Sequence, residues 1–223
     1  FLEKMDVEQL PMDVSHRILL HAARLGNVGC LDRCLSKEGV DVNYRESGQG
    51  KTALDFVLLS SKNNGLIKEI GTSIYSKEEL RYTLDSGVFD WVQIPVNILD
   101  TSFYHEVSKY NSNIKVSVRS VFLQGILFNN QWACNSVKDH DDLLRTLNIV
   151  RELCSKFGIT IQQLSISYLS SLVRVNQIII GTISDDKLIN NISCEKVQLD
   201  KQLICDINEI SLSLKSWTNP RGW

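Results

Sequence analysis

The sequence predicts an α/β fold with a parallel sheet, preceded by an N-terminal segment of helices. Apolar runs such as Gln177–Gly181 are almost uninterrupted, which is typical of parallel strands that are covered on both faces. Each run is followed by a stretch with the apolar spacing of an amphipathic helix, and four such strand–helix units follow one another between residues 66 and 223. A four-stranded parallel sheet of this kind is either open or half of a closed barrel.

The composition is that of a globular protein, because 43% of the 223 residues are hydrophobic and 22% are charged. The net charge of −2 supports neither a nucleic-acid partner nor a membrane-surface partner. No leader-like segment or long apolar run is visible, so we expect a cytoplasmic protein. The six cysteines form no Cys-x-x-Cys pair, and we expect reduced, mostly buried thiols and no metal site. Because the chain opens with Phe1, we expect it to belong to a longer protein.

A weak internal repeat occupies residues 1–65, the first expected domain. Leu20, in Leu-His-Ala-Ala, and Leu54, in Lys-Thr-Ala-Leu-Asp, are 34 positions apart, close to the ankyrin period of about 33 residues. A short helix should end at Gly26, where a left-handed backbone costs little, and Thr52 should cap a later helix. The segment resembles one and a half ankyrin repeats, and a generic helix-turn-helix cap is the alternative.

Between these two helices, the stretch Val28–Ser36 should form another. Its apolar residues Val28, Leu31 and Leu35 have helical spacing, and we expect this stripe to pack on the first helix. Gly39 should end the helix.

The second expected domain, residues 66–223, alternates strands and helices. Two capping boxes mark helix starts, Ser76 with Glu79 and Thr160 with Gln163, and Pro95 should close a strand because it cannot donate to a sheet ladder. In chain order, the expected elements are a strand at Ile67–Gly71, a helix from Ser76 to Gly87, a strand at Phe89–Ile94, a helix at Phe103–Tyr110, a strand at Ile114–Val121, a helix at Asp142–Lys156 that Gly158 ends, a helix from Thr160 to about Leu172, a strand at Gln177–Gly181, a helix from Ser184 and a helix at Asp200–Leu214.

Four motifs in this second part occur in the order and spacing of a known family. They resemble strands five to eight of the aldo-keto reductases and lie at Ile70–Ser76, Phe89–Asp100, Val118–Leu127 and Ile178–Thr182. The tail Asn219–Trp223 is similar to the ending of bacterial members found in surface-polysaccharide synthesis. The resemblance covers residues 66–223. It implies a partial TIM-type (β/α) barrel whose site lies at the carboxyl ends of the strands.

The resemblance also implies NAD(P) as cofactor and gives Ser73 and Gln93 a role at its nicotinamide carboxamide. Both residues stand in strand-end motifs, and the Gln93 amide offers both a donor and an acceptor. From the residues alone, the alternative is that Gln93 is an amide at the top of the barrel whose hydrogen bonds are all made within the protein.

For the other end of the cofactor, the resemblance implies two further groups of residues. Ser120, Leu123 and Gly125 would line a loop over the pyrophosphate, and Thr182, with the amides after Gly181, would face the adenosine phosphate. Lys187 and Asn191 match positions that contact the adenine end. Ordinary capping is the alternative, with Ser120 as a helix cap and Asn191 as a C-cap.

Two departures from the family pattern affect these expectations. Arg119 stands where the family usually stacks an aromatic ring on the nicotinamide, as it does in some bacterial subfamilies. The cation that clamps the 2′-phosphate early in the strand-eight loop is missing, so the sequence does not favour NADP over NAD.

The catalytic Asp, Tyr, Lys and His of the family come from strands two to four, and residues 1–65 contain no matching segment. Leu54–Leu59 has the composition of strand four, but Ser60 then stands at the histidine position. An ankyrin helix explains the same residues equally well. We therefore expect no catalytic residue in this chain and no carbonyl reduction, because the general acid is missing.

Two functions remain open from the sequence. One is an oxidoreductase-family protein that retains a nicotinamide half-site, with a small-molecule carbonyl substrate only if the barrel is completed. The other is a non-catalytic interaction module that binds a protein partner through residues 1–65. Self-association is a further expectation, because half a barrel leaves two sheet edges unpaired.

Overall fold

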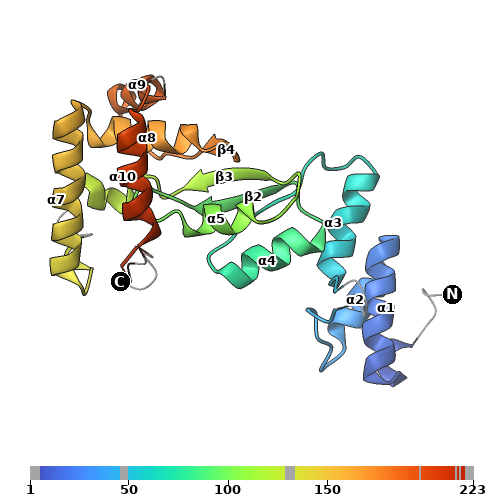
Figure 1. Ribbon diagram of the computed structural model, residues 1–223. Helices are drawn as coiled ribbons and strands as arrows, with labels where there is room; N and C mark the ends of the chain where they lie inside the picture. Colours follow the sequence, from blue (N-terminus) through green and yellow to red (C-terminus); the bar gives the residue numbers. More distant parts are fainter. Residues whose placement is uncertain are drawn as a thin grey trace. The chain divides into compact units, whose positions relative to one another are not determined.

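The computed structural model describes residues 6–45, 50–128, 134–195, 197–213, 215 and 217–218. The chain divides into two compact units (Figure 1). The first comprises Phe1–Thr72 with Arg81–Asp90, and the second comprises Ser73–Leu80 with Trp91–Trp223. Arg81–Asp90 thus joins the first unit from beyond residue 65, and the predicted domain boundary between residues 65 and 66 stays a prediction.

The described N-terminal segment is helical. Its elements are η2 (Val7–Gln9), α1 (Met12–Leu25), α2 (Val28–Ser36) and α3 (Ala53–Asn63). Helix α1 ends at Gly26, whose φ of 66° is left-handed, and Thr52 begins α3 in a reciprocal capping box with Asp55. Both predicted caps are confirmed. Since Leu54–Leu59 lies inside α3, its interpretation as a fourth barrel strand is wrong.

The core of the first unit contains Leu19 and Ala22 of α1 together with Cys30 and Cys34 of α2. The predicted stripe on α2 is wrong in two of its three positions, since Val28 is 75% exposed and Leu35 is 52% exposed, although Leu31 is partly buried against the core. The reason is the rotation of α2. Cys30 and Cys34 are one turn apart and face the core, which turns the larger aliphatic side chains outward.

The α/β part contains a four-stranded sheet in the order β1 (Gly71–Ser73), β2 (Trp91–Pro95), β3 (Lys115–Arg119) and β4 (Val175–Ile178). The predicted parallel sheet is confirmed, because β2 pairs with β3, and β3 with β4, in parallel. The accompanying helices are α4 (Lys77–Ser86), α5 (Ser102–Ser108), η3 (Leu123–Phe128), α7 (His140–Phe157), α8 (Ile161–Ser171), α9 (Asp185–Cys194) and α10 (Lys201–Leu212).

All four strands differ from the expected bounds by one or more residues, and the first and the last differ most. The first begins at Gly71 rather than Ile67 and ends at Ser73. The last was expected as a fully buried strand at Gln177–Gly181, but β4 ends at Ile178, and its middle residues are exposed. This expectation is wrong because β4 is the final strand of the described sheet, so only one of its edges is paired and no neighbour covers its outer side.

The predicted helix signals of the α/β part are confirmed. The backbone nitrogen of Ser76 donates to Glu79 Oε2 at 3.0 Å, and that of Glu79 donates to Ser76 Oγ at 3.1 Å. Thr160 makes a reciprocal capping box at the start of α8. Gly158, with φ of 65°, ends α7 in the left-handed conformation that Gly adopts at low cost.

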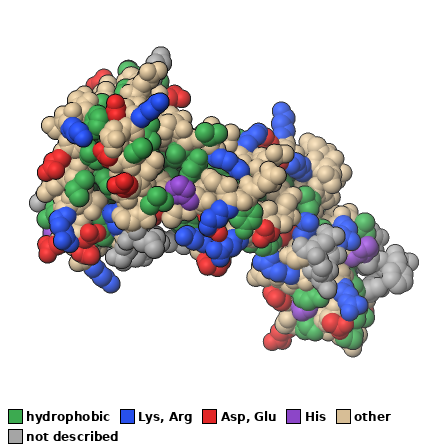
Figure 2. All heavy atoms as spheres, in the orientation of Figure 1, with side chains coloured by type: hydrophobic (Ala, Val, Ile, Leu, Met, Phe, Trp, Pro, Cys, Tyr) green, Lys and Arg blue, Asp and Glu red, His purple; other side chains and the backbone are tan. Residues whose placement is uncertain are grey.

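The surface shown in Figure 2 mixes acidic and basic side chains, as the net charge of −2 predicts. All six cysteines are free thiols, and five of them are buried. Within the described ranges, no helix combines the length and the hydropathy needed to cross a bilayer. The C-terminal tail Asn219–Trp223, which carried the polysaccharide-type similarity, lies outside the described residues.

Candidate functional site

The two residues expected at the nicotinamide are joined directly. Ser73, the last residue of β1, donates its hydroxyl to Gln93 Oε1 at 3.0 Å. The backbone follows the same arrangement, because the nitrogen of Ile74 donates to the carbonyl oxygen of Gln93 at 3.1 Å. Gln93 is the middle residue of β2 rather than its end, where it was expected. Ser73 and Gln93 therefore present one polar group that joins the end of β1 to the middle of β2.

Arg119, which was expected where the family usually has an aromatic ring, is the last residue of β3. Its guanidinium donates to the carbonyl oxygen of Ile74 and to Ser120 Oγ, both at 3.1 Å. The same group lies over the ring of Tyr75, 4.3 Å from the ring centroid, in cation–π geometry. Arg119 thus fixes the segment that follows β1 to the end of β3.

The loop after β3 has an unusual backbone. Ser120, Leu123 and Gln124 have φ values of 62°, 45° and 52°, and Gly125 has 87°. Left-handed conformations cost non-glycine residues roughly 1–3 kcal/mol each, and they concentrate at binding sites. Ser120 precedes η3 by three positions and accepts from Arg119, so its alternative role as a helix cap is not supported.

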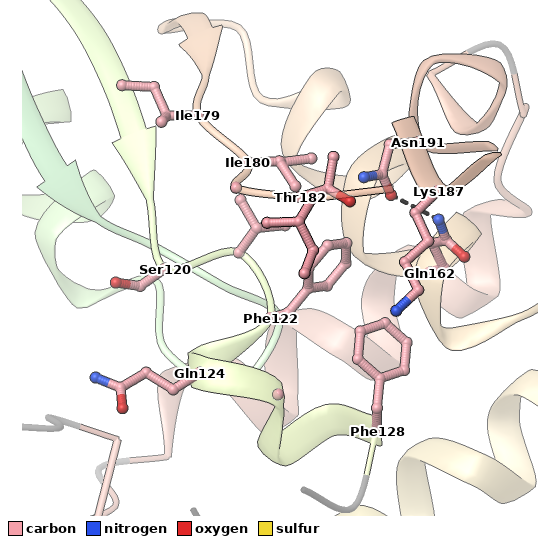
Figure 3. A pocket seen from close by; sticks show the side chains of 14 residues that line it. Ser120, Phe122, Gln124, Phe128, Gln162, Ile179, Ile180, Thr182, Lys187 and Asn191 are labelled. Atoms are coloured by element: carbon pink, nitrogen blue, oxygen red, sulfur yellow. Dashed lines mark hydrogen bonds between the residues drawn. The ribbon is translucent and has the colours of Figure 1, made fainter. Parts of the chain in front are cut away.

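A cavity of about 930 Å³ lies between this loop, the segment after β4 and the helices α8 and α9 (Figure 3). Its volume is in the range of small-molecule sites, roughly 300–1,000 Å³. It sits beyond the carboxyl ends of parallel strands, where α/β proteins bind ligands. Five residues expected at the cofactor line it, namely Ser120, Gly125, Thr182, Lys187 and Asn191.

The other three expected residues lie outside this lining. Ser73, at the end of β1, and Gln93, in the middle of β2, form the polar pair described above. The side chain of Leu123 is fully buried, so only its backbone belongs to the loop beside the cavity.

Thr182 and the start of α9 are engaged in local turns. Thr182 Oγ1 accepts from the backbone nitrogen of Ser184 at 3.3 Å, and Ser184 Oγ accepts from that of Lys187 at 3.5 Å. Asp185 and Asp186 stand exposed in the first turn of α9. Their carboxylates compete with any other anion for the positive end of the helix.

Asn191 is 9% exposed and lies inside α9, three residues before its end at Cys194, so its alternative role as a C-cap is wrong. Gln162 of α8 donates from Nε2 to Asn191 Oδ1 at 2.6 Å, and both side chains line the cavity (Figure 3). Gln162 was not predicted from the sequence. Its partner is 29 positions away, and no local pattern indicates which face of α8 meets α9.

Two aromatic residues of the cavity also escaped the sequence analysis. Phe122 and Phe128, at the start and end of the η3 region, have ring centroids 5.0 Å apart and line the cavity beside Lys187 (Figure 3). Phe122 belongs to the strand-seven motif of the sequence, so the motif was a usable signal, whereas the position of Phe128 depends on the path of the loop.

Fold and site define an α/β protein with a ligand-sized cavity at the carboxyl ends of its parallel strands. The sequence profile of the aldo/keto reductase family matches residues 54–212, which is more than half of the chain, and the chain belongs to that family. The profile of ankyrin repeats matches residues 19–64. Both profiles include residues 54–63, which form α3 in the structure.

Solved structures with a similar fold are aldo-keto reductases. They include AKR11C1 from Bacillus halodurans in its holo form (TM-score 0.57, 15% identity, 87% of this chain and 68% of that chain covered). A second is Tm1743, a thermostable aldo-keto reductase in complex with the inhibitor epalrestat, with a TM-score of 0.53 and 16% identity; the match covers 87% of this chain and 66% of that chain. A third is MGS-M4, from a Medee basin deep-sea metagenome library, with a TM-score of 0.52 and 17% identity; the match covers 88% of this chain and 68% of that chain. The chain thus spans about two thirds of their length. A search of curated proteins gave no match.

Proposed function

We propose that this chain is an aldo-keto reductase-family protein that retains the half-site for a nicotinamide dinucleotide, built by strands five to eight of the family barrel. The observation that carries the proposal is that five of the residues expected at the cofactor line one cavity. Ser120 and Gly125 follow β3, whereas Thr182, Lys187 and Asn191 belong to a segment much later in the sequence, so the meeting of these two segments is a property of the fold.

The chemistry of the cavity fits the adenosine end of such a cofactor. The apolar side chains of Phe122, Phe128 and Ile180 offer surfaces for a base, and Lys187 supplies a cation. Ser73 and Gln93 offer a hydroxyl and an amide to the nicotinamide carboxamide. Asp185 and Asp186 disfavour a 2′-phosphate near the start of α9, so the residues fit NAD better than NADP.

The bound cofactor would supply hydride, but carbonyl reduction also needs a proton donor held against the substrate. Such general acid catalysis contributes roughly 10²–10⁴-fold, and residues 1–65 carry no counterpart of the catalytic Tyr, Lys, Asp and His of the family. We therefore propose that residues 1–223 bind the cofactor weakly and turn over no carbonyl substrate by themselves.

The experiment pairs binding with turnover. Calorimetry should detect NAD and NADP binding to residues 1–223, and NADPH oxidation with a broad aldehyde panel should stay at the protein-free rate. Turnover that disappears in Gln93→Ala would restore the enzyme function. Absence of binding by both dinucleotides would overturn the half-site.

A second candidate function is a protein-interaction module, favoured by the ankyrin profile over residues 19–64. Such helices pack side by side in arrays, and α2 exposes Val28 and Leu35 on the side that turns away from the core. A longer ankyrin array in the full-length gene would favour this function, and strands one to four upstream would favour the enzyme.

We also propose that the second unit associates with another copy of itself through the edge of β4. A groove of about 330 Å³ runs between β4, α8 and α9, and it is lined by Leu188 and Ile192, which are 48% and 59% exposed. Because the sheet is parallel and ordered β1 to β4, a two-fold rotation places β4 of one copy beside β1 of the other. The four strands of each copy then add up to the eight strands of a closed barrel.

A further inference from the structure

The side-chain amide of Asn191 is held in one orientation. Its Oδ1 accepts from Gln162 Nε2 at 2.6 Å, and Asn191 is only 9% exposed. No other hydrogen bond of this amide occurs among the described residues. Since an amide has one acceptor end and one donor end, the contact with Gln162 commits the acceptor and leaves Nδ2 free to donate.

Figure 3 shows where this donor lies. The nitrogen of Asn191 is on the side of Ile180 and Thr182, and the oxygen faces Gln162. Ile180 and Thr182 line the cavity, so the polar group that Asn191 offers to a ligand beside them is an N–H donor.

We infer that Gln162 is a positioning residue that sets the polarity of the base site, so that the cavity recognises a purine ring through its acceptor atoms. The inference rests on the proposed function. Adenine presents ring nitrogens as acceptors and an amino group as donor at position 6, whereas hypoxanthine presents an oxygen acceptor there. A site with a fixed N–H donor accepts both rings.

Exchanging Gln162 for a glutamate should reverse which end of the Asn191 amide faces the cavity. An ionised carboxylate accepts only, so in Gln162→Glu the Asn191 amide must turn its Nδ2 toward α8 and its Oδ1 toward the cavity. The carbonyl can then accept from the amino group of adenine but repels the oxygen of hypoxanthine. An unpaired or repelled buried polar group lowers the affinity by about tenfold.

The test measures ADP and IDP binding to residues 1–223 by calorimetry. The unsubstituted chain should bind both within about threefold, and Gln162→Glu should shift the ratio about tenfold toward ADP. Gln124→Glu is the matched control, because it adds the same charge to the lining of the same cavity without touching Asn191; it should weaken both nucleotides equally. An unchanged ratio in Gln162→Glu overturns the inference.

A ligand-free measurement separates this inference from the proposed function. In ¹⁵N-labelled protein, the Asn191 side-chain NH₂ protons should move downfield in Gln162→Glu, because they gain a carboxylate acceptor, and should stay in place in Gln124→Glu. An unmoved signal overturns the positioning role. Binding of neither nucleotide to the unsubstituted chain overturns the proposed function and the purine ligand, while the amide signal still decides the orientation.

Discussion

The hydroxyl of Ser73 donates a hydrogen bond to Gln93 Oε1 over 3.0 Å and links the end of β1 to the middle of β2. The bond commits the acceptor end of the Gln93 amide and leaves its nitrogen as a donor for the carbonyl oxygen of a carboxamide. Two residues that stand 20 positions apart thus act as one group, and exchanging either one should alter the same contact.

Ser73→Ala and Gln93→Ala should each weaken NAD binding by about three- to tenfold, because one net hydrogen bond contributes about 0.5–1.5 kcal/mol. ADP-ribose lacks the nicotinamide, so calorimetry with this ligand should give the same affinity for the unsubstituted chain and for both variants. Ser108→Ala, at the end of α5, serves as the matched serine control. Equal losses for NAD and ADP-ribose would contradict the assignment of this pair to the nicotinamide.

The double variant Asp185→Asn/Asp186→Asn should bind NADP more tightly, by about two- to fivefold, with little change for NAD. The two carboxylates stand in the first turn of α9, and exposed charges at a helix end contribute about 0.3–1 kcal/mol each. The gain should shrink at high salt, since exposed charges are screened. Calorimetry at low and high ionic strength measures it, and a gain that survives high salt would argue against an electrostatic origin.

Asp55→Ala should destabilise the first unit by about 2–4 kcal/mol. The carboxylate is buried, accepts from Thr52 N at 2.8 Å and from Thr52 Oγ1 at 2.9 Å, and also accepts from the hydroxyl of Tyr82. The substitution removes one half of the capping box of α3, and the loss of a cap typically costs about 0.5–2 kcal/mol. It also leaves the hydroxyl proton of Tyr82 without its acceptor, which costs about 1–3 kcal/mol.

Urea unfolding measures this effect, and Asp139→Ala is its control, because Asp139 is an exposed cap of α7 with a single bond of 3.3 Å. The loss in Asp139→Ala should be about 1 kcal/mol. In a Tyr82→Phe background the effect of Asp55→Ala should become smaller, and an unchanged effect would show that the tyrosine contact adds nothing.

Stability should fall as the pH rises from about 9 to 11, in part through one thiol. Burial raises the pKa of Cys154 from its ordinary value of 9.0 to about 11. Between these values the unfolded chain loses the thiol proton while the folded chain keeps it, so the unfolded state gains stability. Below pH 9 both states hold the proton and the contribution is constant. Urea unfolding should show that the free energy of unfolding of Cys154→Ala declines less steeply between about pH 9 and 11. An equally steep decline would contradict the assignment to the Cys154 thiol.

Sedimentation at rising concentration should show self-association that Leu188→Lys and Ile192→Lys abolish. Both side chains line the groove beside β4, and a lysine there would have to be buried on association, which is costly for an unpaired charge. Leu212→Lys, at an exposed position of α10, should leave the association unchanged. A monomer at every concentration would contradict the pairing of β4 with β1 of another copy.

Local sequence was sufficient for the helix starts and ends that carry a capping box or a glycine. Thr52, Ser76 and Thr160 each form a reciprocal bond with a residue three positions later. Such caps depend on neighbours in the chain, so a sequence displays them completely. Glycines at helix ends are equally local, because their left-handed backbone needs no partner. The order of strands and helices followed from the alternation of these signals with apolar runs.

The tertiary structure alone decided which faces are buried and how the polar groups of the site are oriented. The sequence determined that α2 is a helix, but its packing turned Cys30 and Cys34 inward and Val28 outward. The sequence likewise indicated the helix that contains Asn191, whereas the contact with Gln162, 29 positions away, determines which end of the Asn191 amide faces the cavity. The physical reason is range: caps and periodicity act within one or two turns, while burial and amide orientation depend on residues that only the folded chain brings together.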